Sequence, residues 1–236
     1  MAIPFKNNCI NFYPLNNNFD SLTGIKPNSY SGTFNSSEKC IEFKGSEYID
    51  FPLSALELPS HNFSIILQVK LNIKSGDEGI IWIGSLGANN PTWSKGLYCN
   101  ASSIYLGAAN SGNVYGWGQS ISNGISLFNT IDDFDTIVIT DTEEFCKLYI
   151  NGKLIATSEN PGITPTSGSI TLGKHDGYCN GLYRNLGSYN IVFTEEQVKQ
   201  ITFNYESQKI KSLIKDTILN NKLFREHCIL YENEEE

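Results

Sequence analysis

Arginine is almost missing from this chain. Only Arg184 and Arg225 occur among 236 residues, and the formal net charge is −8. Proteins that bind nucleic acid or an anionic membrane surface contact phosphate through clustered Lys and Arg. The sequence has no such basic stripe, so we expect no nucleic-acid partner. Abundant Asn, Ile and Lys beside so little Arg is typical of an AT-rich genome.

Metal-binding and disulfide patterns are missing as well. Histidine occurs three times, at His61, His175 and His227, and no Cys-x-x-Cys pair exists, so no zinc spacing is present. The six cysteines are Cys9, Cys40, Cys99, Cys146, Cys179 and Cys228. We expect free, buried thiols. An even number also permits three disulfides in an oxidising compartment, and the sequence leaves their pairing open.

Long apolar runs are the third absence. Residues 1–13 lack the apolar core of a secretory signal, and runs such as 80–83 are far shorter than the roughly 20 residues that span a bilayer. The sequence therefore predicts neither export nor membrane insertion.

The hydrophobic pattern that is present has a period of two, the period of β-strands. Between Phe63 and Leu71 every odd position is apolar, while Ser64, Gln68 and Lys70 point to the other side. Further strands are expected at 40–43, 48–51, 79–83, 96–100, 103–107, 136–140, 146–150, 153–158, 169–172 and 181–193. Many short strands separated by Gly, Asn and Ser turns predict an all-β sandwich or barrel.

Turn and capping signals divide the chain. Asn151-Gly152 supplies the two positive-φ residues of a type I′ hairpin turn between 146–150 and 153–157. Thr194 and Gln197 have capping-box spacing, which predicts a short helix near 194–200. Apolar residues at helical spacing then predict a C-terminal amphipathic helix. We expect a β-domain at 1–203, this helix at 204–227 and an acidic tail at 228–236.

The apolar stripe of the C-terminal helix has two interpretations. It consists of Ile210, Leu213, Ile214, Thr217, Ile218 and Asn221. The stripe covers the open face of the β-domain, which we favour, or it joins copies of the chain into a homo-oligomer. Thr217 and Asn220 interrupt the a/d pattern, so a dedicated coiled coil is not expected.

Ordered short patterns resemble one known family, the laminin-G-like branch of the concanavalin A-like lectin/glucanase superfamily. The patterns lie at 12–20, 43–49, 136–140, 147–155, 169–173 and 190–198. The resemblance runs from about residue 10 to 200, and the clostridial neurotoxin binding region contains a related jelly-roll. It implies a two-sheet antiparallel jelly-roll sandwich. The fold hosts lectins, adhesins, toxin domains, viral spikes and glycan-cleaving enzymes, so it does not decide the function.

Catalysis is not expected. Glycoside hydrolysis needs two carboxyl groups aimed at one sugar bond, and the Glu-x-Asp-x-x-Glu string of the superfamily's glucanases does not occur. Outside the tail, carboxylates two residues apart occur only at Asp133/Asp135 and Asp141/Glu143, at the ends of one expected strand, where acidic turn residues are common. A glycosidase remains the third hypothesis.

Glycan binding is better supported. Sugars are typically held by an aromatic ring and planar polar groups in loops on a rigid sheet. Candidate residues lie in three segments: Asn89, Asn90 and Trp93; Asn110, Asn113, Tyr115 and Trp117; and Asp176, Tyr178 and Asn180. The alternative is that the Asn residues form turns and the aromatics fill the core, as we expect of Trp82. Asp176 is also a weak candidate for calcium, which needs about 6–8 oxygen ligands.

We therefore expect a non-catalytic module that recognises glycan or protein. An adhesin-like fold without an export signal suits a phage or viral fibre, spike or decoration protein, which contacts a host-surface glycan or another virion protein. The alternative localisation is cytoplasmic. The alternative function is a purely structural assembly protein that uses the C-terminal helix.

Overall fold

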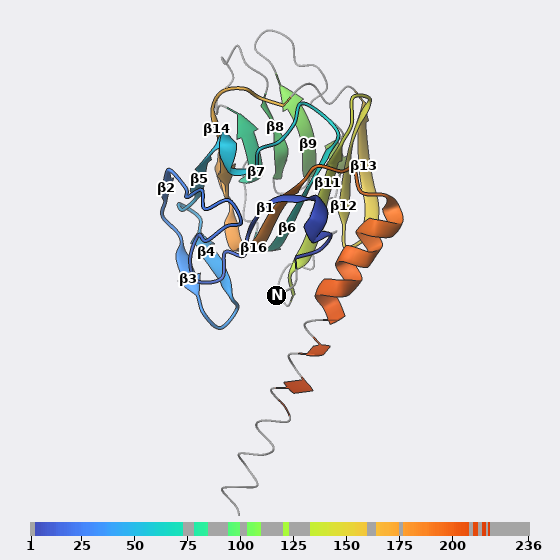
Figure 1. Ribbon diagram of the computed structural model, residues 1–236. Helices are drawn as coiled ribbons and strands as arrows, with labels where there is room; N and C mark the ends of the chain where they lie inside the picture. Colours follow the sequence, from blue (N-terminus) through green and yellow to red (C-terminus); the bar gives the residue numbers. More distant parts are fainter. Residues whose placement is uncertain are drawn as a thin grey trace, which may run out of the picture.

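Two β-sheets packed face to face form the body of the protein (Figure 1). The computed structural model describes residues 3–72, 78–84, 94–99, 103–109, 120–122, 133–159, 164–174 and 177–207, and the single positions 210, 211, 214, 215 and 217. Strand pairing is antiparallel, apart from the short parallel contact between β15 (Gly177–Tyr178) and β7 (Glu78–Gly84). The predicted all-β sandwich is confirmed.

In the described part of the chain, each sheet has eight strands. Sheet A contains, in order, β13 (Lys153–Glu159), β12 (Phe145–Ile150), β11 (Asp135–Asp141), β6 (Phe63–Leu71), β16 (Asn180–Tyr189), β4 (Cys40–Lys44) and β3 (Thr33–Asn35), with β1 (Cys9–Tyr13) beside β16. Sheet B contains β10 (Ser120–Ser122), β9 (Ser103–Ala109), β8 (Ser94–Cys99), β7 (Glu78–Gly84), β14 (Ser169–Leu172), β5 (Ile49–Pro52) and β2 (Ser29–Tyr30), with β15 (Gly177–Tyr178) beside β7. Short 3₁₀ helices occupy Lys6–Asn8 and Leu53–Ala55.

Every expected strand is present. The strands without a prediction are short or polar ones such as β2, β3, β10 and β15.

The alternation of β6 fills the core between the sheets. Phe63, Ile65, Leu67, Val69 and Leu71 all belong to the inter-sheet cluster. Their neighbours across the interface come from sheet B, where Ile81 and Ile83 point inward. Trp82 lies between those two residues on the strand, so its side chain is on the outer face of sheet B. It is buried, as expected, yet it is no part of the core between the sheets.

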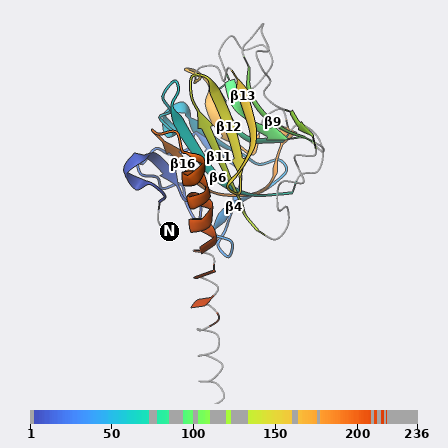
Figure 2. The same ribbon diagram turned by 90° about the vertical axis from the view of Figure 1, so that its right-hand side faces the viewer.

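A helix covers the outer face of sheet A (Figure 2). It begins after Thr194, and the capping box is confirmed: the Thr194 N–H donates to Gln197 Oε1 (2.9 Å) and the Gln197 N–H to Thr194 Oγ1 (3.3 Å). Val198, Ile201 and Tyr205 pack against apolar residues of sheet A. The helix runs from 195 to 207 without interruption, so it joins the short helix expected near 194–200 to the start of the one expected at 204–227, and no Gly or Pro lies within it.

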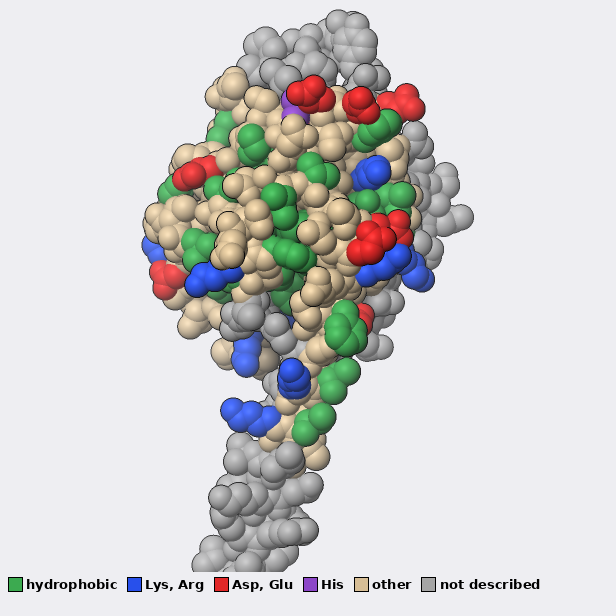
Figure 3. Space-filling view, turned by 45° about the vertical axis from the view of Figure 1, so that its right-hand side comes forward, with side chains coloured by type: hydrophobic (Ala, Val, Ile, Leu, Met, Phe, Trp, Pro, Cys, Tyr) green, Lys and Arg blue, Asp and Glu red, His purple; other side chains and the backbone are tan. Residues whose placement is uncertain are grey.

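The apolar stripe farther along the helix does not cover the sandwich. Ile210 and Ile214 are 57% and 54% exposed, and Phe203 on the preceding turns is 66% exposed. Figure 3 shows hydrophobic side chains along one side of the helix where it leaves the body. The favoured interpretation is therefore wrong for Ile210 and Ile214, because the earlier residues Val198 and Ile201 already occupy that face.

The Asn151-Gly152 hairpin is confirmed. The two residues have φ of 49° and 78°, and they join β12 to β13. The Asn151 side chain also fixes a neighbouring strand: its Nδ2 donates to Asp135 Oδ1 (2.6 Å), and the Thr136 N–H donates to its Oδ1 (2.9 Å). The turn therefore anchors the start of β11.

Five cysteines lie in the described part of the chain, and all five are free: Cys9, Cys40, Cys99, Cys146 and Cys179. This agrees with the expected free thiols. Burial raises the pKa of the Cys9 thiol to about 11 and that of Cys146 to about 12. Among the described residues, no helix is both long and apolar enough to cross a bilayer.

Two leucines of the hairpin test the inter-sheet core. Leu148 is fully buried, whereas Leu154 is 45% exposed. We expect Leu148→Ala to lower the free energy of unfolding by about 2–5 kcal/mol, because the lost methyl groups leave a cavity. The matched Leu154→Ala should change it by less than about 0.5 kcal/mol. Urea unfolding followed by circular dichroism measures both, and equal effects would contradict this assignment of the core.

Candidate functional site

The outer face of sheet B carries polar and aromatic side chains. Ile49 and Phe51 point into the core, so Asp50 between them points outward. Thr171 lies opposite both Asp50 and Trp82 in the sheet register. The row Asp50, Thr171 and Trp82 therefore crosses three adjacent strands on the face that the C-terminal helix leaves uncovered.

Three aromatic rings form the part of this face over β7, β8 and β9. The Tyr98 and Tyr105 rings are stacked, with centroids 4.6 Å apart, and the Trp82 ring meets Tyr98 edge-on at 6.3 Å. Gly96 lies beneath the indole, where a Cβ atom would come within 2.6 Å of Trp82 Cε3. Because Trp82 and Tyr98 are only 3% and 9% exposed, they shape the face without offering a free ring surface.

A free ring surface is offered by Tyr178, which is 38% exposed. Its ring centroid is 6.1 Å from that of Tyr48. The Lys174 ammonium lies 4.4 Å from the Tyr48 centroid and 5.3 Å from the Tyr178 centroid. We call Tyr48, Lys174 and Tyr178 the tyrosine cluster. Its cation–π contacts hold the two rings and a charged hydrogen-bond donor in one arrangement.

Asp50 supplies an acceptor on the same face. It is two residues from Tyr48, so both side chains lie on one side of the chain at β5. Asn28 Nδ2 donates to Asp50 Oδ2 (3.3 Å), but the buried Oδ1 atom has no hydrogen-bond partner. Buried polar atoms in folded proteins are nearly always hydrogen-bonded.

Most of the binding residues expected from the sequence lie outside the described part of the chain: Asn89, Asn90, Trp93, Asn110, Asn113, Tyr115, Trp117 and Asp176. Tyr178 and Asn180 are described, and they belong to different sheets. Tyr178 pairs with Gly79 in sheet B, whereas Asn180 pairs with Lys44 in sheet A. The chain changes sheets at the intervening buried Cys179.

Three residues of the candidate site were missed from the sequence: Tyr48, Asp50 and Lys174. The signal for the first two was the alternation of the expected strand at 48–51, which puts both on its polar side. No comparable signal exists for Lys174, because its place between the rings depends on the bend at Gly173 (φ 79°).

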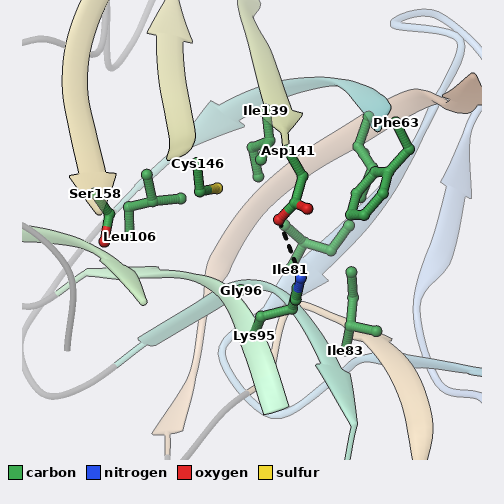
Figure 4. Close-up of a pocket in the computed structure, with 11 residues that line it drawn as sticks. Phe63, Ile81, Ile83, Lys95, Gly96, Leu106, Ile139, Asp141, Cys146 and Ser158 are labelled. Carbon is green, nitrogen blue, oxygen red and sulfur yellow. Dashed lines mark hydrogen bonds and ion pairs between the residues drawn. The ribbon is translucent and has the colours of Figure 1, made fainter. Parts of the chain in front are cut away.

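A second cluster of polar groups lies between the sheets (Figure 4). Phe63, Asp141, Cys146 and Ser158 are successive register partners across β6, β11, β12 and β13. Lys95 reaches them from β8 of the opposite sheet, and its Nζ is 3.0 Å from Asp141 Oδ2. His61 Nδ1 is hydrogen-bonded to Asp141 Oδ1 at 3.2 Å. Burial raises the pKa of the Asp141 carboxyl, although the neighbouring Lys95 opposes this shift.

This inter-sheet cavity cannot hold a sugar. Its volume is about 20 Å³, which is enough for about one water molecule. A larger groove of about 190 Å³ lies on the outer face of sheet A, between β12 and the start of the helix, and Phe145 and Lys147 are among its lining residues. Phe145 is 36% exposed.

Neither carboxylate pair from the sequence forms a catalytic pair. Asp135 is fully buried and accepts the Asn151 hydrogen bond, so it supports the hairpin. Asp141 points between the sheets, whereas Glu143 is exposed in the turn after β11. In the described ranges, no three His, Cys, Asp or Glu residues gather into a set that could hold a metal ion, and the calcium candidate Asp176 lies outside those ranges.

Comparison with known proteins agrees with this architecture. The family model of the concanavalin A-like lectin/glucanases superfamily matches residues 43–199. No curated protein sequence matches the chain.

Solved structures with low sequence identity share the fold. Domain 4 of AbnA, a GH43 extracellular arabinanase from Geobacillus stearothermophilus solved with arabinotriose, superposes with a TM-score of 0.61 at 19% identity, over 83% of this chain and 98% of that one. Trypanosoma rangeli sialidase gives 0.64 at 13% identity, over 87% and 34%. The binding domain of botulinum neurotoxin DC, solved with rat synaptotagmin II, gives 0.59 at 18%, over 84% and 52%.

The structural role of Asp135 can be tested directly. We expect Asp135→Ala to lower the free energy of unfolding by about 1–3 kcal/mol, because it leaves the Asn151 amide without its acceptor. Asp133→Ala, at a half-buried position, should have a smaller effect. Chemical denaturation measures both. If the wild type releases reducing sugar and Asp135→Asn does not, the result would instead support the glycosidase hypothesis.

Proposed function

This chain belongs to the concanavalin A-like lectin/glucanase superfamily, and we propose that it is a non-catalytic recognition module that binds glycan through the outer face of sheet B. Its structural neighbours include a domain solved with arabinotriose and a domain solved with a protein partner. The fold is therefore shared by proteins with carbohydrate and protein ligands, and the choice between them has to come from the site.

The tyrosine cluster is the observation that carries the proposal. The exposed Tyr178 ring offers an apolar face for the C–H side of a sugar ring. The Lys174 ammonium offers donors, and the half-buried Asp50 carboxylate on the same face adds a polar acceptor group. Such a combination of one aromatic face and few polar groups on a rigid sheet suits a polyhydroxylated ligand.

A recognition role is favoured over hydrolysis by the placement of the acids. Glycosidases need two carboxyl groups about 5–10 Å apart on either side of one bond. Among the described side chains, Asp50 is the carboxylate that we place in this site, and Asp135 and Asp141 are buried elsewhere. Binding without turnover is the function that we assign to this chain.

We further assign the module to a phage or virus particle, as the head of a fibre, spike or decoration protein. The helix packs on sheet A, whereas β5 and β14 beside the tyrosine cluster belong to sheet B, and the helix leads away from the body (Figure 1). This arrangement suits a head whose binding face points outward from its attachment. A host-surface polysaccharide is the ligand that we expect in this setting, and labelled protein should bind intact host cells but not cells stripped of that polysaccharide.

Substitution of one exposed ring tests the binding face. We expect Tyr178→Ala to weaken binding by about 5- to 30-fold, because a lost aromatic contact of this kind contributes about 1–2 kcal/mol. The probe is a printed glycan array, read with and without calcium, followed by calorimetry with the best glycan. Phe145→Ala is the matched control, since Phe145 has nearly the same exposure on the other sheet.

The control also distinguishes the two surfaces. Unchanged binding by Phe145→Ala supports the sheet B site. Loss of binding in Phe145→Ala with full binding in Tyr178→Ala would move the site to the groove on sheet A. Absence of binding to any glycan on the array, with calcium present, would contradict the proposed function.

Assembly through the C-terminal helix is the second candidate function. The observation that favours it is the exposure of Phe203, Ile210 and Ile214. An isolated helix with exposed apolar residues is marginal in water. Ser207, Ile210, Ile214 and Thr217 recur at spacings of three and four, which places them on one seam. Glu206 and Lys211 flank that seam with opposite charges, so we take a second copy of this chain as the partner.

Introducing two negative charges on the seam tests whether the helix holds copies of the chain together. We expect Ile210→Asp combined with Ile214→Asp to convert the wild-type oligomer to a monomer without unfolding the β-sandwich, because both side chains are exposed within one chain. Light scattering after gel filtration measures the mass, and circular dichroism checks the fold. A wild type that is monomeric at high protein concentration would eliminate the assembly role.

A further inference from the structure

The ion pair between the two sheets is unusual in its burial. The side chains of Lys95 and Asp141 are 7% and 1% exposed, and the Nζ to Oδ2 distance is 3.0 Å. Removing two charges from water has a desolvation penalty that the attraction between them often fails to offset. A buried ion pair of this kind is therefore weak evidence for stabilisation, which raises the question of what else the two groups do.

The surroundings of the pair are largely apolar. The Lys95 ammonium lies 5.4 Å from the centre of the Phe63 ring, and apolar side chains such as Ile81 and Ile139 line the same cavity. In a dry site, transfer of one proton from the ammonium to the carboxylate removes both charges. The raised pKa of Asp141 agrees with that direction. Such a transfer would give a free amine and a carboxylic acid in contact.

We propose that Lys95 and Asp141 condense to an intramolecular amide bond that joins β8 of sheet B to β11 of sheet A. After the proton transfer, Nζ attacks Asp141 Cγ and forms the C–N bond. The C–Oδ2 bond then breaks, and Oδ2 leaves as water with its own proton and one from Nζ. One amide bond and one water molecule are formed, and no group is oxidised or reduced.

The geometry meets the requirements of this step. The Lys95 amine nitrogen and the Asp141 carboxyl oxygen Oδ2 are 3.0 Å apart, so the two groups are in contact before the reaction. His61 Nδ1 lies 3.2 Å from Oδ1, the oxygen that stays behind as the amide carbonyl. An N–H at that position stabilises the negative charge that develops on Oδ1 during attack. The cavity of about 20 Å³ beside the pair has room for the water that is released.

The neighbouring nucleophile is a poorer competitor. Cys146 is the register partner of Asp141 on β12, and its thiol lines the same cavity. Burial raises the pKa of this thiol to about 12, so the reactive thiolate is scarce. Attack by the Lys95 amine is therefore the expected reaction of the Asp141 carboxyl.

Such a bond would give the sandwich a covalent cross-link although its described cysteines are free. It would close the chain between residues 95 and 141 and hold the two sheets together at one end. Like a disulfide, it would restrict the unfolded state, but it would resist reducing agents.

Intact-mass spectrometry of the purified, folded chain tests the proposal. We expect a mass lower than that of the sequence by one water molecule. Because trypsin does not cut after an acylated lysine, we also expect one tryptic peptide covering 75–147. A further digestion at aromatic residues inside the 96–140 segment should leave its two ends joined.

Two conservative variants complete the test. Lys95→Arg keeps the charge facing Asp141 but lacks a nucleophilic amine, so we expect it to fold and to show the full mass. Lys26→Arg changes a lysine in the exposed pair with Asp20 and should keep the mass loss of the wild type. A folded wild type with the full sequence mass would overturn the proposal, as would a mass loss that persists in Lys95→Arg. Complete linking in His61→Ala would overturn the part assigned to His61.

Discussion

The burial of one shared apolar layer between two sheets is the constraint on which the rest of this structure depends. Each strand can send only alternate side chains into that layer, so every strand presents its remaining residues to an outer face. In β6 the inward set is entirely apolar from Phe63 to Leu71. Lys95 and Asp141 break this rule by meeting inside the layer. A charged pair at such a place requires a chemical reason, and a covalent bond between the two groups is one.

The helix covers the outer face of sheet A but not that of sheet B. Sheet A buries its outer residues Ile66, Val138 and Tyr149 beneath the helix that starts at Thr194. The outer face of sheet B carries Asp50, Thr171 and the tyrosine cluster. Because the helix already occupies one face, a ligand and an attachment point can be on opposite sides of the same small domain. In the proposed function, sheet B binds the ligand, and the exposed apolar residues farther along the helix, on the other side of the domain, serve for attachment.

Membership of the superfamily restricts the fold more than the function. The neighbours include a domain solved with a trisaccharide, an enzyme and a toxin domain solved with a protein, all at identities below 20%. The features of this chain that bear on function are individual side chains: the exposed ring of Tyr178, the Asp50 carboxylate on the same face and the structural use of Asp135 beneath Asn151. The functional argument therefore rests on these side chains.

Local chemistry made much of the fold predictable. Alternation placed the strands, Asn151-Gly152 placed the hairpin, and Thr194 with Gln197 placed the start of the helix, because each signal acts over a few neighbouring residues. The contacts between distant segments were not predictable in this way. The outward direction of Trp82, the exposure of Ile210, the separation of Tyr178 from Asn180 and the meeting of Lys95 with Asp141 all depend on which strand lies beside or opposite which. The sequence by itself determined the strands, turns and family resemblance, whereas only the packing of the two sheets decided which side chains became neighbours, since that choice depends on long-range burial.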